Sequence, residues 1–246
     1  MEIERSFIIT TRPKQKYKNI SGSCFDVVNI PVTEVHISGK IKEIKKELNQ
    51  FNPSVIILTS STGSAILMNL GISGNFRFIC IGDKTAMPLM DAGINAEIPE
   101  EKNSHGLADY IEKHVNREDR IALCRSEQHD YYIDRFLAKN GYAFKDLPLY
   151  SLKAIPSDGI LNHIERKHCM GILFTSSLEA QVVIEFLSEK QKLDVLNNKK
   201  VFSIGKTTSN TLIKYRIKTE AVKSESDFEA IIKEISEKNC NSGEWI

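Results

Sequence analysis

Val55-Ile56-Ile57-Leu58-Thr59-Ser60-Ser61 and Gly171-Ile172-Leu173-Phe174-Thr175-Ser176-Ser177 are two copies of one pattern, an apolar run that ends in Thr-Ser-Ser. A second apolar run follows each copy and ends in Ile81-Gly82-Asp83-Lys84-Thr85 or in Ile204-Gly205-Lys206-Thr207-Thr208. Thr59 and Thr175 lie 116 residues apart. A period of that length indicates two similar structural units rather than a solenoid.

The similarity extends to the run that opens each half. Phe7-Ile8-Ile9-Thr10-Thr11-Arg12 opens the first half, and Ile121-Ala122-Leu123-Cys124-Arg125 opens the second. Both are apolar runs that end in arginine, and two units fit comfortably into 246 residues. The residues alone therefore predict two domains, with one boundary near residue 117.

Apolar runs rich in β-branched residues alternate with segments of helical periodicity along the whole chain. Strands are predicted at 6–11, 25–32, 55–59, 76–81, 94–98, 120–124, 142–153, 171–175, 200–204 and 217–221. Helices are predicted at 41–51, 64–70, 85–92 with Pro88 in the first turn, 104–116 capped by Ser104, 129–140, 160–166, 178–190, 207–214 and 226–238. This alternation predicts an α/β fold of two similar domains, each a parallel sheet flanked by helices.

Composition narrows the functional class. The chain is 41% hydrophobic and 26% charged with a formal net charge of +1, which is typical of a soluble globular protein and excludes a globally basic nucleic-acid binder. No apolar run approaches the roughly 20 residues that span a membrane. The charged start Met1-Glu2-Ile3-Glu4-Arg5 does not resemble a signal peptide. We therefore expect a cytoplasmic protein without a membrane or nucleic-acid partner.

The cysteines lead to the same expectation. There are five, an odd number, and no two of them form a C-x-x-C pair. Three lie in or beside apolar strand runs. The sequence therefore predicts that all five are reduced: Cys24, Cys80, Cys124, Cys169 and Cys240.

Candidate binding residues gather where the predicted strands end. Ligands of open α/β sheets bind at the carboxyl ends of strands, and free backbone N–H groups at helix N-termini favour anions. The repeated turns therefore predict two anion-binding edges that together hold a polyanionic ligand between the domains. Taken one at a time, each hydroxyl is also explained as a plain helix cap. The predicted substrate-binding residues are Arg12, Thr59, Ser60, Ser61, Lys84, Thr85, Arg125, Thr175, Ser176, Ser177, Lys206, Thr207 and Thr208.

Several other kinds of site are excluded. Gly205-Lys206-Thr207 resembles the end of a P-loop, but Lys200 stands where that motif needs glycine. No G-x-G-x-x-G follows the first strand, which excludes the usual nicotinamide site. The six histidines are scattered, so we expect no metal. Tyr150 can donate a proton at neutral pH because a phenol has a pKa near 10; the alternative is a half-buried strand tyrosine.

Taken together, the motifs resemble the uroporphyrinogen-III synthase family. They follow in the order Thr10-Thr11-Arg12-Pro13, Ile57-Leu58-Thr59-Ser60-Ser61, Ile81-Gly82-x-x-Thr85-Ala86, Pro148-Leu149-Tyr150, Phe174-Thr175-Ser176-Ser177 and Ile204-Gly205-x-Thr207-Thr208. The resemblance runs from about residue 7 to residue 235. It rests on the order and spacing of the motifs rather than on any one of them.

The resemblance implies a discontinuous domain arrangement. Residues 1–32 and 154–246 would form one α/β domain, residues 37–149 would form an inserted α/β domain, and 33–36 and 150–153 would be linker strands. Family enzymes close hydroxymethylbilane to uroporphyrinogen III, with inversion of ring D and loss of water. They are lyases of porphyrin (haem and sirohaem) biosynthesis that use no cofactor. A single chain forms the site, so a monomer suffices.

The resemblance also implies residue roles. Tyr150 matches the tyrosine proposed as the general acid for the leaving hydroxyl, and Thr85 and Thr208 match threonines of the binding site. A second reading from another class is a non-catalytic, two-lobed regulatory module that binds a tetrapyrrole or another anion. Retention of Tyr150 and of both Ile-Gly-x-x-Thr copies favours the enzyme.

Overall fold

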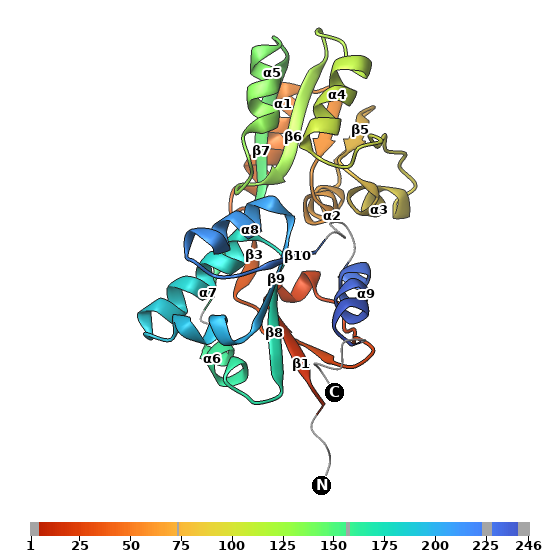
Figure 1. The fold of residues 1–246 in the computed structure, drawn as a ribbon. Coiled ribbons are helices and arrows are strands. Elements are labelled where there is room, and N and C mark those ends of the chain that lie inside the picture. The colour runs from red at the N-terminus through yellow and green to blue at the C-terminus, as the bar shows by residue number, and fades with distance from the viewer. Residues whose placement is uncertain (1–4, 73, 156–157, 223–227, 241–246) are drawn as a thin grey trace. The chain divides into compact units, whose positions relative to one another are not determined.

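A computed structural model describes residues 5–72, 74–155, 158–222 and 228–240. The chain divides into two compact units (Figure 1). Unit 1 comprises Met1–Glu34 and Lys153–Ile246, and unit 2 comprises Val35–Leu152. The boundary near residue 117 that the residues alone suggested falls inside unit 2.

Unit 1 contains a five-stranded sheet in the order β10-β9-β8-β1-β2, and its pairings are parallel. Its strands are β1 (Phe7–Thr10), β2 (Asp26–Asn29), β8 (Cys169–Phe174), β9 (Lys200–Ile204) and β10 (Glu220–Val222). Its helices are α6 (Asp158–Ile164), α7 (Ser177–Glu189), α8 (Gly205–Lys214) and α9 (Phe228–Asn239), with short 3-10 helices at Lys14–Lys16 and Leu193–Asn198.

Helices cover both faces of this sheet. Side chains alternate along each strand, so a strand that is apolar throughout gives the sheet two apolar faces that must be covered. Ile9 belongs to a core cluster with residues of α6, α7 and α8, whereas its neighbour Ile8 belongs to a cluster with residues of α9. Both isoleucines are fully buried. A strand that is buried on both faces reads as the continuous apolar run seen in the sequence.

Unit 2 contains a five-stranded sheet in the order β3-β7-β6-β4-β5, in which β4 pairs parallel with β5 and β6, and β6 with β7. Its strands are β3 (Thr33–Ile37), β4 (Val55–Leu58), β5 (Arg77–Cys80), β6 (Arg120–Ser126) and β7 (Ala143–Ala154). Its helices are α1 (Ile41–Phe51), α2 (Ser61–Asn69), α3 (Asp83–Asp91), α4 (Ser104–His114) and α5 (Tyr132–Lys139).

The two faces of this second sheet are covered in the same way. Ile56 and Leu58 of β4 pack in a cluster with residues of α1, α2 and α3, while Val55 and Ile57 pack in a cluster with residues of α4 and α5. The predicted fold class, two parallel sheets flanked by helices, is therefore confirmed. No helix among the described residues is long and apolar enough to cross a membrane.

Some helix starts differ from the predictions. The predictions placed these starts too late, because they relied on the apolar residues of each helix. The predicted helix 64–70 begins at Ser61, and Pro88 lies in the second turn of α3 because that helix starts at Asp83. Asn103 caps α4, its side chain accepting a hydrogen bond from the N–H of Gly106, so the prediction for Ser104 is wrong.

One other predicted element is shorter than expected, and one extends beyond the described residues. The strand expected at 94–98 is reduced to an isolated bridge between Ile79 and Glu97. The helix predicted at 226–238 is described only from Phe228, and its expected first residues lie outside the described part of the chain.

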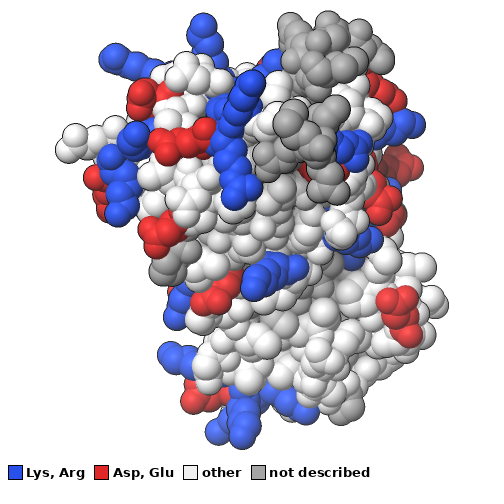
Figure 2. Space-filling view, turned by 90° about the horizontal axis from the view of Figure 1, so that it is seen from below, with Lys and Arg blue, Asp and Glu red and all other residues white. Residues whose placement is uncertain are grey.

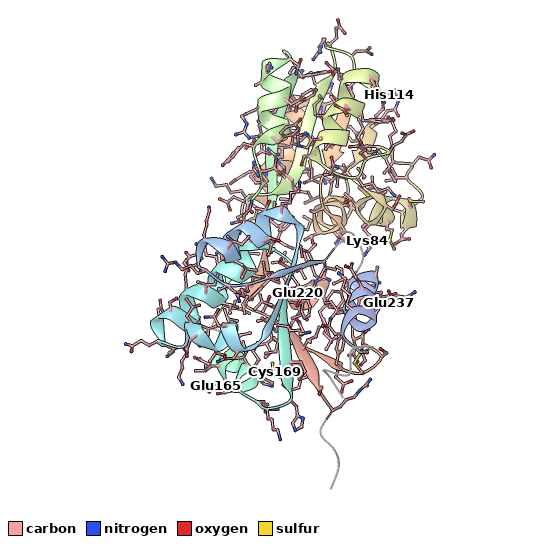
Figure 3. The ribbon with its side chains drawn as sticks, in the orientation of Figure 1. Lys84, His114, Glu165, Cys169, Glu220 and Glu237 are labelled. Carbon is pink, nitrogen blue, oxygen red and sulfur yellow. A yellow bond between two sulfur atoms is a disulfide. The ribbon has the colours of Figure 1, made fainter. Side chains whose placement is uncertain are left out.

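The prediction that all five cysteines are reduced is wrong for two of them. Cys24, just before β2, forms a disulfide with Cys240, just after α9. The two residues are 216 positions apart in the sequence, which is why no local pattern revealed the pair. Cys80, Cys124 and Cys169 are free and buried, as predicted, and Figure 3 labels Cys169 in β8.

Counting thiols tests this assignment. Native protein without reductant is expected to react slowly with a thiol reagent, because burial raises the pKa of Cys80 and Cys124 to about 12 and that of Cys169 to about 11. Denatured, unreduced protein should show the three free thiols, and reduction should add the two of the disulfide. Five thiols before reduction would contradict the assignment.

Gly171 provides a test of strand packing in unit 1. A Cβ atom on this residue would lie 2.3 Å from the carbonyl oxygen of Lys200 on the neighbouring strand. Gly171→Ala should therefore lower the free energy of unfolding by about 1–3 kcal/mol in urea denaturation. Gly39→Ala is the matched control, because a Cβ there meets nothing within 4 Å. Equal midpoints for the two variants would contradict this packing.

Candidate functional site

The parallel register brings the predicted residues of unit 2 to one edge of its sheet. Leu58, the last residue of β4, pairs with Cys80 at the end of β5 and with Cys124 of β6. Ser126, the last residue of β6, pairs with Tyr150 of β7. The Thr59-Ser60-Ser61 turn and the start of α3 therefore share the carboxyl edge, and Tyr150 lies at the same edge, where the sequence analysis had not placed it.

Tyr150 and Ser60 form the centre of this edge. The Tyr150 side chain is almost completely buried, and its hydroxyl donates a hydrogen bond to Ser60 Oγ at 2.9 Å. Ser60 is the N-cap of α2, and the same Oγ accepts the N–H of Gly63 at 3.0 Å. Because Ser60 Oγ accepts twice, its own proton is directed away from both donors. The Tyr150 phenol and the Ser60 hydroxyl thus form a short hydrogen-bonded chain in which Tyr150 donates to Ser60.

The other predicted residues of this edge differ in exposure. Thr59 is half-buried and Ser61 is exposed at the first position of α2. Lys84 is exposed near the start of α3, where Figure 3 labels it, and Thr85 beside it is buried. The exposed ammonium group and the first turns of two helices favour an anion at this edge.

Arg125 does not present a cation to this edge. Its side chain is 2% exposed, and its guanidinium pairs with Asp134 of α5 and, through Nε at 2.7 Å, with Asp146 of β7. The pattern that placed Arg125 after a strand could not reveal these two carboxylates. We therefore do not retain Arg125 among the residues proposed to contact substrate.

Among the described residues, one group could in principle hold a metal ion. His129, Asp134 and Asp146 offer ligand atoms that lie within 4.8 Å of one another. The guanidinium of Arg125 already pairs with both carboxylates and supplies the positive charge that a cation would bring. The arrangement is therefore explained as an internal ion pair, and we propose no metal for it.

The matching turn of unit 1 lies at the carboxyl edge formed by β1, β8 and β9. Ser176 caps α7, its Oγ accepting the N–H of Glu179 at 3.2 Å, as Ser60 caps α2. Ser177 is half-buried at the first position of α7. The equivalence of the two Thr-Ser-Ser turns thus extends to their capping geometry.

Thr175 is engaged by a residue that the sequence analysis missed. Its N–H and hydroxyl both donate to the carboxylate of Glu179, at 3.2 and 3.1 Å, and Thr11 donates its hydroxyl to the same carboxylate at 3.0 Å. Glu179 is 3% exposed. The signal that could have found it is Ser176-x-x-Glu179, the sequence signature of a capping box.

Two cations lie near this buried carboxylate. Burial raises the pKa of Glu179, whereas its hydrogen bonds with Thr175 and Thr11 and the charge of Arg12 lower it. Burial lowers the pKa of Lys16, and the charge of Glu179 raises it. Arg12 also stacks over the ring of Phe228, 4.4 Å from its centroid. The charges of Arg12 and Lys16 therefore interact with that of Glu179 at the edge of unit 1.

The remaining predicted residues lie at the start of α8. Lys206 and Thr207 are exposed, whereas Thr208 is buried, as its repeat partner Thr85 is. On the face that Figure 2 shows, basic and acidic side chains are interspersed. The exposed positive groups of the two edges are therefore local features of a chain whose net charge is only +1.

Comparison with known proteins settles the family. The family model described as uroporphyrinogen-III synthase HemD matches residues 16–233, which is most of the chain. The chain belongs to the uroporphyrinogen-III synthase family. No curated protein matches it in sequence.

Solved uroporphyrinogen-III synthases share the fold. A methionine-substituted variant of the Thermus thermophilus enzyme has a TM-score of 0.65 at 16% identity, covering 97% of this chain and 100% of that one. The Helicobacter pylori enzyme also has a TM-score of 0.65, at 18% identity, covering 93% and 97%. At such identities these likenesses establish the fold of this family member, and the roles of its residues rest on its own geometry.

The pH dependence of stability tests the burial of Glu179. Because burial raises its pKa, the folded protein keeps this proton at pH values where the unfolded chain has lost it. Its contribution to stability is present below the unfolded value, near 4.3, and is lost as pH rises through the folded value.

We therefore expect the unfolding free energy of the wild type to fall relative to that of Glu179→Gln as pH rises from about 4 toward neutrality. Glu185→Gln, on the exposed face of the same helix, is the control and should follow the wild type. Parallel curves for Glu179→Gln and the wild type would contradict the burial argument.

Proposed function

We propose that this protein is a uroporphyrinogen-III synthase, a lyase that cyclises hydroxymethylbilane with inversion of ring D and loss of water. Family membership supports the reaction. The observation that supports a role for particular residues is the hydrogen bond from Tyr150 to Ser60 at the carboxyl edge of unit 2.

The chemistry requires little from the protein beyond proton supply and orientation. The pyrrole rings of the substrate are electron-rich and push out the terminal hydroxyl, which leaves as water once it has received a proton. A positioned general acid makes that departure faster. Inversion of ring D requires its substituted carbon to attack instead of its free carbon. The protein must therefore hold the linear tetrapyrrole in a conformation that favours this attack.

Tyr150 is proposed as the proton source. Its hydroxyl donates to Ser60 Oγ, which also accepts the N–H of Gly63, so the proton of Ser60 is left to donate to a third group. A proton passed from Tyr150 to Ser60 would therefore release the serine proton toward a leaving hydroxyl group. This arrangement allows a nearly buried phenol to act on a substrate that reaches the exposed side of the turn.

Substrate carboxylates are proposed to bind at the two carboxyl edges. The substrate is a polyacid, and helix N-termini with nearby cations favour anions. In unit 2 the proposed contacts are Thr59, Ser60, Ser61, Lys84 and Thr85. In unit 1 they are Arg12, Ser176, Ser177, Lys206, Thr207 and Thr208, while Thr175 is occupied by Glu179.

Three further properties belong to the proposal. The substrate supplies its own electrons, so the reaction needs neither a metal nor an organic cofactor. One chain carries both edges, so a monomer suffices. We propose a cytoplasmic location, which the three free cysteines support and in which the Cys24–Cys240 disulfide would depend on local redox conditions.

A coupled assay tests the reaction. Hydroxymethylbilane is generated in situ, the products are oxidised, and the type I and type III isomers are separated. We expect predominantly type III, because spontaneous closure gives type I. Type I alone would overturn the proposed function and favour the alternative, a non-catalytic module that binds tetrapyrroles or other anions.

The same assay tests Tyr150. Tyr150→Phe should lower the rate of type III formation by about 10- to 100-fold without abolishing it, at or below the lower limit of typical general-acid effects, because the substrate also ionises unaided. Tyr142→Phe is the matched control. That tyrosine is also buried in unit 2, but its hydroxyl donates to the carbonyls of Ile111 and Val115. Equal rates for Tyr150→Phe and the wild type would remove the assigned role.

A further inference from the structure

An internal anion occupies the Thr175 turn of unit 1. The Glu179 carboxylate accepts the Thr175 N–H, the Thr175 hydroxyl and the Thr11 hydroxyl, all within 3.2 Å. These donors come from the ends of β1 and β8, which is the edge where an α/β sheet binds its ligand. With Glu179 in place, donors that suit a ligand carboxylate are already satisfied.

The equivalent turn of unit 2 carries no such group. Counting 116 residues back from Glu179 gives Gly63, whose N–H binds Ser60 Oγ as the N–H of Glu179 binds Ser176 Oγ. A Cβ at Gly63 would lie 3.1 Å from Ser60 Oγ and 3.3 Å from the carbonyl oxygen of Cys124, so a side chain there would be crowded. The two repeats therefore differ in charge at the same position.

The charge of Glu179 also acts on the cations beside it. Arg12 lies two residues after the end of β1 and Lys16 lies in the 3-10 helix Lys14–Lys16, and both interact electrostatically with the Glu179 carboxylate. One negative charge therefore offsets part of the positive potential that these two side chains would present to a polyanion.

We propose that Glu179 lowers the anion affinity of the substrate-binding edge of unit 1. Its carboxylate excludes a substrate carboxylate from the Thr11 and Thr175 donors and weakens the attraction of Arg12 and Lys16 for anions. Binding at this edge then depends on several simultaneous contacts and not on one strong anion site. The inference rests on the proposed function, because that function makes the ligand a polycarboxylate tetrapyrrole.

Binding of uroporphyrin III, a fluorescent octacarboxylate, tests the inference without relying on turnover. Glu179→Gln keeps the shape of the side chain and removes its charge. We expect this variant to bind the porphyrin about three- to tenfold more tightly than the wild type at low salt, because one partly screened negative charge no longer repels the ligand. Because salt screens such interactions, the difference should shrink in roughly 0.5 M NaCl.

Two further variants make the test specific. Glu185→Gln removes the same charge from the exposed face of α7 and should bind like the wild type. Lys16→Gln should bind more weakly than the wild type, and the Lys16→Gln/Glu179→Gln double variant should return toward wild-type affinity. If Glu179→Gln does not fold, the inference still requires Lys16→Gln to weaken binding at low salt.

The outcomes separate this inference from the proposed function. Tighter binding by Glu179→Gln supports it. Unchanged or weaker binding by a folded Glu179→Gln overturns it, as does a lack of binding by both proteins or an unaltered affinity of Lys16→Gln. The isomer assay on the wild type decides the proposed function separately, since type I product alone would refute the synthase whatever the porphyrin titration shows.

Discussion

Parallel hydrogen bonding within each sheet is the constraint on which the rest of the structure depends. Parallel strands run in one direction, so every strand of a parallel set ends at the same edge, and residues far apart in sequence meet there. Leu58, Cys80 and Cys124 are aligned by this register, and the turns beyond them follow. Helices that start from those turns direct their N–H groups to the same side. The preference of this edge for anions thus follows from strand direction and helix N-termini, whatever side chains lie there.

The two units use this common plan with different internal charges. In unit 2 a buried cation, Arg125, is compensated by Asp134 and Asp146. In unit 1 a buried anion, Glu179, is compensated by Thr11, Thr175 and nearby cations. A buried charge costs several kcal/mol when it lacks partners, and both of these buried charges have hydrogen-bonded partners. Similar backbones therefore enclose buried charges of opposite sign.

The fold was predictable to the extent that it depends on local pattern. Continuous apolar runs such as Val55–Leu58 are typical of strands buried on both faces, and their alternation with helices implies parallel sheets. Several interactions that the sequence did not reveal join distant residues. Ser60 and Tyr150 are 90 residues apart, and Thr11 and Glu179 are 168 apart, so no window of sequence contains either pair. Arg12 and Arg125 look equivalent as the last residues of apolar runs. Only the fold shows that two carboxylates enclose one of them.

The division of the chain bears on the order in which it can fold during synthesis. Unit 2 is one continuous segment, Val35–Leu152, which holds all of its strands except the first two residues of β3 and the last two of β7, so its sheet can form from one uninterrupted stretch of nascent chain. Unit 1 is different, because β1 pairs with β8, whose residues are made more than 150 positions later. Until β8 has been synthesised, β1 lacks this partner strand, and apolar residues such as Ile8 and Ile9 stay exposed while unit 2 forms. Nascent chains of this topology are open to capture by chaperones during that interval.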